Sequence, residues 1–402
     1  MSPESNLPPW WARPDLDYRR GRLHFQNTDL PATVSESGTP AFLYSADRMS
    51  ANLQRLDQAL SGRSVPHRIY YAMKANRFPP LLAHLRSLGS FGVDVCSPGE
   101  LRLALQTGFE PSEIVFTGTC LSDRDLEILA AHPEVLINCD SLSVIRRLGK
   151  LCPGRSIGLR INPQLGFGYT HALVYSGETP TKFGIYAGRF EEALELAAGS
   201  DLHVAGLHFH CGSGLLGSQQ DIMQGLLDKA AWFLDRCPQA RSLDIGGGLG
   251  IPMASGDQPL DLQAWSRTIA DFAAPRRLTI LLEPGDYAVK DAGILLVKVT
   301  MVEEKGGVTF VGVDAGYNIQ NLRVFYDLPF VIVPLEISPE TQWRTVTVAG
   351  NINEALDLWA ENIPLPASLG EGDVLAILNV GGYGSASASN HCLRGEFGEV
   401  LL

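Results

Sequence analysis

The sequence predicts an α/β protein that joins a TIM-type (β/α)8 barrel to a C-terminal β-rich domain. Over residues 41–285, short apolar runs alternate with segments of helical period, which is typical of βα units around a parallel sheet. Beyond residue 285 the pattern changes to strands separated by turns. The chain has 402 residues, and a barrel takes roughly 200 to 250 of them, so a second domain is expected.

The barrel strands are expected where the apolar runs fall. Amphipathic segments such as 126–131 and 190–198 lie between these runs and predict the helices. About eight or nine βα units result, which fits a TIM-type barrel. In chain order the expected strands are 41–44, 68–73, 91–95, 114–117, 135–138, 157–161, 204–210, 243–246 and 278–283.

The β-rich domain is expected over residues 286–402. Residues 1–40 contain the run Gly-Arg-Leu-His-Phe and no long helical pattern, so this N-terminal segment is expected to add a strand to that domain. The predicted strands of the β-rich domain are 294–302, 308–313, 331–337, 345–348 and 374–378.

Composition and charge exclude several classes of protein. The 32 basic and 44 acidic residues leave a net charge of −12, which opposes nucleic-acid binding through a general basic field. No apolar stretch approaches the roughly 18 residues that span a bilayer, and the N-terminus lacks the pattern of a signal peptide, so a cytoplasmic protein is expected. The seven scattered cysteines, without a C-x-x-C pair, are expected to be reduced thiols.

Reactive groups of a barrel sit at the C-terminal ends of its strands, and Lys74 closes the run Tyr-Tyr-Ala-Met-Lys. Desolvation at a barrel mouth is expected to lower the pKa of this lysine, which suits Schiff-base chemistry. The alternative is a lysine whose amine extends to the surface.

Two histidines, His208 and His210, share one face of a predicted strand, and a turn with Ser213 follows. Paired histidines suggest a metal site, but no third ligand stands at a suitable spacing and H-E-x-x-H is absent, so no metal is predicted. A histidine against an aromatic cofactor and a structural, hydrogen-bonded pair remain as alternatives.

A third strand end runs into Gly246, Gly247 and Gly248, whose backbone N–H groups can approach a phosphate closely. The spacing is not that of a dinucleotide-binding or P-loop motif. Its late position agrees with the common phosphate site of barrels, and a plain tight turn is the alternative.

The fourth strand end is Glu283 in Leu-Leu-Glu-Pro-Gly. A buried carboxylate needs a partner. A protonated pyridine nitrogen would be one, and an ion pair with Arg160 is the alternative.

A lysine, a ring-facing histidine, a glycine turn and a carboxylate on four strand ends are together what pyridoxal phosphate requires. With these motifs, from about Gly38 to the C-terminus, the chain resembles the alanine-racemase-fold (fold type III) amino-acid decarboxylases, most closely the diaminopimelate decarboxylases. The resemblance implies a carboxy-lyase that uses pyridoxal 5'-phosphate, acts on a small amino-acid substrate and forms a homodimer with shared active sites.

The resemblance also implies roles for single residues. Lys74, His210 and Glu283 match the catalytic residues: the Schiff-base lysine, the histidine stacked on the pyridine and the partner of the ring nitrogen. The further residues matched to cofactor binding are Asp94, Arg160, Ser213, Gly246, Gly247, Gly248, Gly285 and Tyr383. Those matched to substrate binding are Asp286, Arg323, Tyr326, Asn353 and Glu354.

Two positions depart from the family pattern. Asn353 replaces a proton-donating cysteine, and an amide is no general acid, which leaves His391 or Cys392 as substitutes. Asp286 replaces an arginine and reverses a charge. We therefore predict a decarboxylase of a non-standard amino acid or carboxylated amine conjugate, in secondary-metabolite or siderophore biosynthesis. The alternatives are a true diaminopimelate decarboxylase and a catalytically silent regulatory homologue.

Overall fold

The computed structural model describes residues 9–402, and the chain divides into two compact units. The barrel unit comprises Ser50–Ile251 and Gln258–Ala288. The β unit comprises the chain up to Met49, Pro252–Asp257 and Val289–Leu402. What the sequence predicts for residues 1–8 lies outside the described residues.

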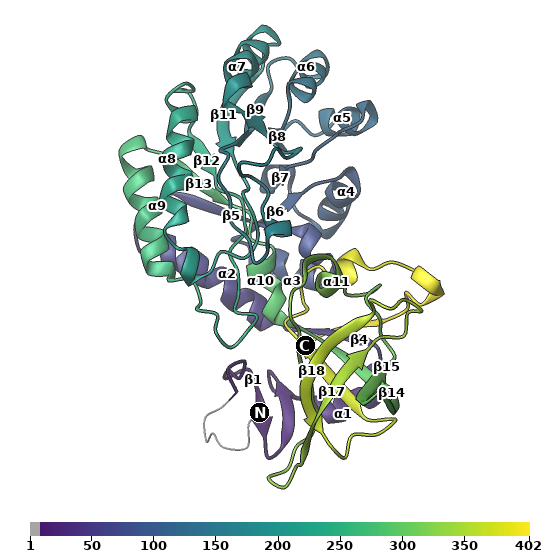
Figure 1. Ribbon diagram of the computed structural model, residues 1–402. Helices are drawn as coiled ribbons and strands as arrows, with labels where there is room; N and C mark the ends of the chain where they lie inside the picture. The colour runs from purple at the N-terminus through teal and green to yellow at the C-terminus, as the bar shows by residue number, and fades with distance from the viewer. Residues whose placement is uncertain (1–8) are drawn as a thin grey trace. The chain divides into compact units, whose positions relative to one another are not determined.

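The barrel unit contains a closed ring of eight parallel strands with helices around its outside (Figure 1). The ring closes because β9 pairs with both β8 and β11, while β13 pairs with β5. A short ninth strand, β10, pairs with the C-terminal end of β9 and was not predicted. The strands are β5 (His67–Ala72), β6 (Gly92–Val95), β7 (Ile114–Phe116), β8 (Leu136–Cys139), β9 (Ser156–Asn162), β10 (Ile185–Tyr186), β11 (His203–His208), β12 (Ser242–Asp244) and β13 (Thr279–Leu282).

Capping side chains set where several outer helices begin. Ser97, Ser122 and Ser141 each accept a hydrogen bond from a backbone N–H of the following first turn. Each cap turns the chain away from the barrel soon after a strand. The helices are α2 (Ala46–Ser61), α3 (Pro79–Ser87), α4 (Pro98–Thr107), α5 (Asp123–Ala130), α6 (Leu142–Leu151), α7 (Phe190–Gly199), α8 (Ile222–Leu234), α9 (Leu262–Arg276) and α10 (Asp286–Val289).

The β unit is an eight-stranded sheet with a separate three-stranded sheet, β1–β2–β3. Its long strand β14 pairs with β4 and β19 along its first half and with β15 along its second. The elements are β1 (Leu16–Arg19), β2 (Arg22–Phe25), β3 (Thr28–Asp29), α1 (Leu30–Ser37), β4 (Ala41–Tyr44), β14 (Gly293–Lys305), β15 (Val308–Val313), α11 (Leu322–Tyr326), β16 (Val331–Pro334), β17 (Trp343–Ala349), β18 (Leu358–Pro366), β19 (Val374–Leu378) and β20 (Gly398–Leu401).

The predicted fold class is confirmed, but one predicted barrel strand was wrongly assigned. Residues 41–44 do form a strand, β4, which pairs with β14 and β20 of the β unit. All four of its residues are buried, so its sequence shows no alternation that would distinguish it from a barrel strand. Pairing with distant segments therefore decided its place.

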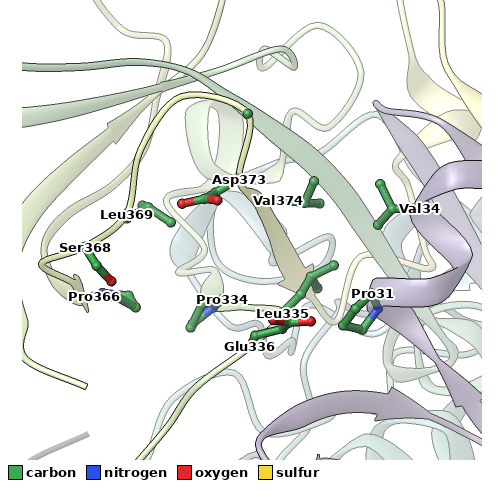
Figure 2. Close-up of a pocket in the computed structure, with 11 residues that line it drawn as sticks. Pro31, Val34, Pro334, Leu335, Glu336, Pro366, Ser368, Leu369, Asp373 and Val374 are labelled. Atoms are coloured by element: carbon green, nitrogen blue, oxygen red, sulfur yellow. The ribbon is translucent and has the colours of Figure 1, made fainter. Parts of the chain in front are cut away.

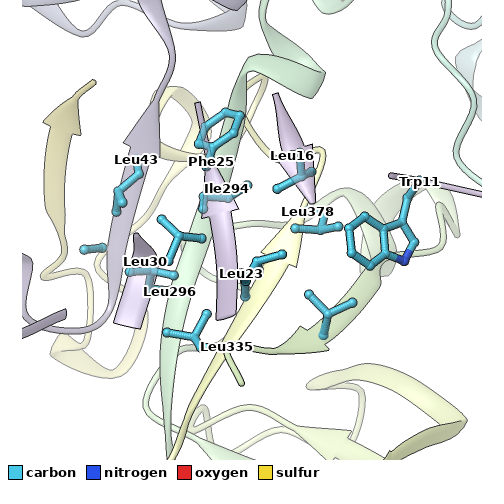
Figure 3. Close-up of a cluster of buried hydrophobic side chains, with 13 residues drawn as sticks. Trp11, Leu16, Leu23, Phe25, Leu30, Leu43, Ile294, Leu296, Leu335 and Leu378 are labelled. Atoms are coloured by element: carbon cyan, nitrogen blue, oxygen red, sulfur yellow. The ribbon is translucent and has the colours of Figure 1, made fainter. Parts of the chain in front are cut away.

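A buried apolar cluster joins the N-terminal segment to the main sheet of the β unit (Figure 3). Leu23 and Phe25 of β2 pack in one cluster with Ile294 and Leu296 of β14. The backbone N–H of Leu23 also donates to the carbonyl of Leu335 at 2.8 Å. Within the described residues, no helix has both the length and the apolar character needed to cross a membrane.

Candidate active site

The carboxyl ends of the barrel strands bring together titratable side chains from segments far apart in the sequence. Lys74 lies in a short 3-10 turn, η1 (Met73–Ala75), directly after β5. Asp94 is in β6, Arg160 in β9, and Glu283 directly follows β13. Asp94, Arg160 and Glu283 are each at most 6% exposed. This end of a barrel is where enzymes of this fold place their chemistry.

Glu283 has a hydrogen-bond partner on each carboxylate oxygen. Its Oε2 lies 3.0 Å from Nε2 of His208, and its Oε1 accepts from the Thr117 hydroxyl at 3.1 Å. Burial would raise the pKa of Glu283, but His208 and Lys74 outweigh it and lower the pKa to about 2. Glu283 is therefore ionised at neutral pH.

Asp244, at the end of β12, has the opposite titration behaviour. Burial and the nearby charge of Glu283 raise its pKa well above the usual value. Two adjacent carboxyls with diverging pKa values are typical of acid–base sites. His208, Asp244 and Glu283 each place one potential metal-ligand atom within 4.8 Å of the other two. The atoms of His208 and Glu283 are already joined to each other by a hydrogen bond.

Lys74 corrects an expectation from the sequence. Burial acts to lower its pKa, but Asp94, Glu283 and Cys96 together outweigh burial, and the pKa is raised. The predicted lowering was wrong because a strand-end sequence does not reveal which carboxylates neighbouring strands supply. Lys74 as a residue is partly exposed, and at neutral pH its amine is a cation among acidic groups.

His210 and Arg160 complete the barrel mouth. The ring centroid of His210 lies 5.3 Å from that of Tyr175, and burial, Lys74 and Arg160 lower the pKa of His210 well below its usual value, so it is neutral. The Arg160 guanidinium lies 4.5 Å from the ring centroid of Phe183. Throughout residues 9–402, no ion pair joins Arg160 to Glu283, whose hydrogen-bonded partner is His208.

Two loops that carry the predicted phosphate ligands lie side by side. The backbone N–H of Gly214 donates to the carbonyl of Gly248 at 2.8 Å, which brings Ser213 close to the glycine turn. Gly248 has a φ of 92°, and a Cβ there would stand 2.3 Å from the carbonyl oxygen of Gly212. A Cβ on Gly247 would stand 2.2 Å from the carbonyl oxygen of Glu283. Glycine is therefore required for this close approach.

These residues fit pyridoxal phosphate. An ionised Glu283 suits a protonated ring nitrogen, a partly exposed Lys74 suits a covalent link, and the glycine turn with Ser213 suits a phosphate. Buried polar atoms without a hydrogen-bond partner among residues 9–402 also gather there: Oδ1 of Asp94 and Nδ1 of His210. Gly285 lies next to this group and is buried.

The predicted substrate residues divide between the two units. Asp286 begins α10 in the barrel unit and is 4% exposed. In the β unit, Arg323 pairs with Asp327 at 3.0 Å, Glu354 lies 3.6 Å from His391, and Asn353 is exposed. Tyr326 ends α11, and Tyr383 is partly buried with a φ of 57°.

A surface pocket of about 340 Å³ lies elsewhere, in the β unit (Figure 2). Pro31, Val34, Leu335 and Leu369 line it together with Glu336 and Asp373. It contains no predicted site residue and no basic group, so it offers neither a cofactor link nor a phosphate site.

Sequence reasoning missed Thr117, Asn138 and Asp244 as parts of the site. Thr117 and Asn138 end the predicted strands 114–117 and 135–138, and this position is the signal that could have found them. Asp244 lies inside the predicted strand 243–246 but ends the observed strand β12. Thr117 and Asn138 belong to no motif with a distinctive spacing, and Asp244 stands two residues before Gly246 in a segment that was selected for its glycines.

Comparisons with known proteins agree with this geometry. The family model described as "Pyridoxal-dependent decarboxylase, pyridoxal binding domain" matches residues 46–290. The diaminopimelate decarboxylase of Methanothermobacter thermautotrophicus is 33% identical, with 97% of this chain and 92% of that protein covered. The structure of diaminopimelate decarboxylase from M. jannaschii in co-complex with L-lysine is 26% identical, with a TM-score of 0.88 and coverage of 97% and 93%. The Helicobacter pylori enzyme complexed with L-lysine is 28% identical, with a TM-score of 0.84 and coverage of 93% and 94%.

Proposed function

The chain belongs to the pyridoxal-dependent decarboxylases and is thus a pyridoxal-phosphate-dependent carboxy-lyase, and on this premise we propose that its substrate is diaminopimelate. The similarity to enzymes of that name extends over nearly the whole chain, including the β unit. Their structures with L-lysine support the proposal, since lysine is diaminopimelate without one carboxylate.

The structural observation behind the proposal is the ionised Glu283 near the partly exposed Lys74, which supports decarboxylase chemistry, while the choice of substrate rests on the named relatives. Bound pyridoxal phosphate supplies an electron sink for the electron pair that CO₂ leaves behind. Glu283 would keep a proton on the ring nitrogen, which maintains that sink. Lys74 would hold the cofactor, and the neutral His210 would present a ring face without adding charge.

The earlier expectation of a non-standard substrate finds no support among the relatives, which are named diaminopimelate decarboxylases. It rested on Asp286 and Asn353. Asp286 is buried in the barrel unit, where a carboxyl group would suit a cationic partner, and this one observation keeps a second candidate: an amino acid that carries a cationic group near Asp286.

The test is CO₂ release from diaminopimelate and from amine-bearing carboxylated analogues, with purified protein loaded with pyridoxal phosphate. Faster turnover of diaminopimelate than of any analogue supports the proposal. Faster turnover of a cationic analogue favours the second candidate, and Asp286→Asn should then abolish the preference. No CO₂ from any of these substrates would contradict both.

We also propose that the enzyme is a homodimer with shared active sites. The predicted cofactor residues Lys74 and Glu283 belong to the barrel unit, whereas Glu354 and Tyr383 belong to the β unit. A two-fold dimer would let each subunit contribute to its partner's site.

A further inference from the structure

We propose that Thr117 and Asn138 are positioning residues, which hold the Glu283 carboxylate in the orientation that accepts the protonated ring nitrogen of the cofactor. This inference rests on the proposed cofactor site and deepens it. Thr117 follows β7, and Asn138 belongs to β8, so two neighbouring strands of the barrel support a side chain that follows β13.

The chemistry of the three side chains sets the direction of both hydrogen bonds. The Thr117 hydroxyl lies 3.1 Å from Oε1 of Glu283, and Nδ2 of Asn138 lies 2.9 Å from the same hydroxyl. An ionised carboxylate only accepts, and an amide NH₂ only donates. The single proton of the Thr117 hydroxyl must therefore point to Glu283. Held from both sides, the hydroxyl has no alternative orientation.

The strand beside β8 leaves space for this arrangement. Gly158 of β9 is in register with Asn138, and a Cβ on Gly158 would stand 2.1 Å from the Asn138 Oδ1. Gly158 is not among the residues with positive φ, so its backbone does not itself require glycine. Its missing side chain provides room for the Asn138 amide, which is 3% exposed.

Glu283 is thereby held at both oxygens. Thr117 contacts Oε1, and His208 contacts Oε2 from β11 on the other side. Rotation of the carboxylate about its last side-chain bond would strain both hydrogen bonds at once. A buried network of this kind specifies one arrangement because each unmade hydrogen bond in a low-dielectric interior is costly.

The test compares Thr117→Val, which removes the hydroxyl, with Thr117→Ser, which keeps it. Thr119→Val is the matched control, since the Thr119 hydroxyl lies 3.9 Å from Cys120 Sγ and takes no part in the network. Two quantities are measured: the dissociation constant of pyridoxal phosphate from the apoprotein, and the pH dependence of the absorption of the bound cofactor. Thr117→Val should weaken binding about ten-fold and shift the pH profile, because one donor to a buried charge is lost. Thr117→Ser should restore both quantities, and Thr119→Val should change neither.

Gly158→Ala provides an independent test, because it should displace the Asn138 amide without deleting any member of the network. It should shift the pH profile in the same direction as Thr117→Val. If Thr117→Val only lowers the thermal midpoint and leaves both quantities at the control values, the role is structural and the inference is wrong.

Nuclear magnetic resonance of the His208 ring in the apoprotein separates this inference from the proposed function. Thr117→Val should shift the His208 resonance, because both residues contact the same carboxylate. An unshifted resonance overturns the positioning role. If Thr117→Val shifts the His208 resonance but the wild-type protein binds no pyridoxal phosphate, the proposed function is overturned instead.

Discussion

The imidazole Nε2 of His208 lies 3.0 Å from Oε2 of Glu283, and both side chains are buried. Burial lowers the pKa of His208, which favours the neutral imidazole. The pKa of Glu283 is also lowered, to about 2, which favours the charged carboxylate. At neutral pH the pair is therefore a neutral imidazole that donates to an ionised carboxylate.

His208→Phe should lower kcat about ten-fold or more, because Glu283 loses a donor that stabilises its charge. His208→Gln keeps an N–H donor and should retain more activity. Steady-state kinetics of the two variants across pH test this. Equal loss in both would show that ring shape, rather than hydrogen bonding, is the contribution of His208.

Lys74 should carry the covalent link to pyridoxal phosphate. Borohydride reduction of the loaded protein, followed by peptide mapping, should place the label on Lys74, because it is the lysine beside Asp94 and Glu283. Lys74→Ala should abolish both the label and the activity. A label on Lys182 or Lys298 in wild type would contradict the site assignment.

Asp244→Asn should change how apoprotein stability depends on pH. The pKa of Asp244 is raised by folding, so the native state holds a proton that the unfolded state releases above about pH 4, and stability falls as pH rises. The Asp244→Asn variant lacks this pH dependence. In wild type the free energy of unfolding should fall by up to about 1.4 kcal/mol per pH unit between the unfolded-state pKa and the native-state pKa of Asp244. Urea unfolding at pH 4.5 and pH 7.5 should show a larger advantage of the variant at the higher pH. An equal advantage at both values would contradict the raised pKa.

Arg155 should contribute strongly to the stability of the barrel unit. Its guanidinium donates to the carbonyls of Leu129, His132 and Val135 at 2.7 to 2.8 Å, and it is 7% exposed. Arg155→Met removes three hydrogen bonds from a buried guanidinium, although the Leu129 and His132 carbonyls keep backbone N–H donors. The loss should cost about 2–4 kcal/mol of the free energy of unfolding. Arg124→Met, at an exposed position of α5, is the control. Similar denaturant midpoints for the two variants would refute this role.

Shared active sites should be visible by complementation. Lys74→Ala and Glu354→Ala proteins, mixed after subunit exchange, should recover up to about a quarter of the wild-type sites, because half of the dimers are mixed and each has one intact site. The measurement is CO₂ release before and after exchange. No recovery, with exchange verified, argues that each subunit completes its own site.

The local sequence was sufficient to predict those strands whose apolar pattern agrees with their position in the fold. The eight strands of the closed ring are apolar runs between amphipathic helices, and each was predicted within a few residues, whereas the two-residue β10 was missed. β4 was assigned to the wrong unit because a fully buried strand looks the same in either sheet. β18 and β20 were missed because polar residues interrupt the first and the second is short.

By itself, the sequence determined the fold class, the cofactor and the segments that carry Lys74, His210, Gly246–Gly248 and Glu283, because each lies in a short motif at a strand end. Only the tertiary structure decided the electrostatics of the site. The raised pKa of Lys74 depends on carboxylates that β6 and β13 bring beside it. The hydrogen bonds from Asn138 to Thr117 and from Thr117 to Glu283 likewise join residues that are 21 and 166 positions apart. Charge and hydrogen bonding act through distance in space, and closure of the barrel sets those distances.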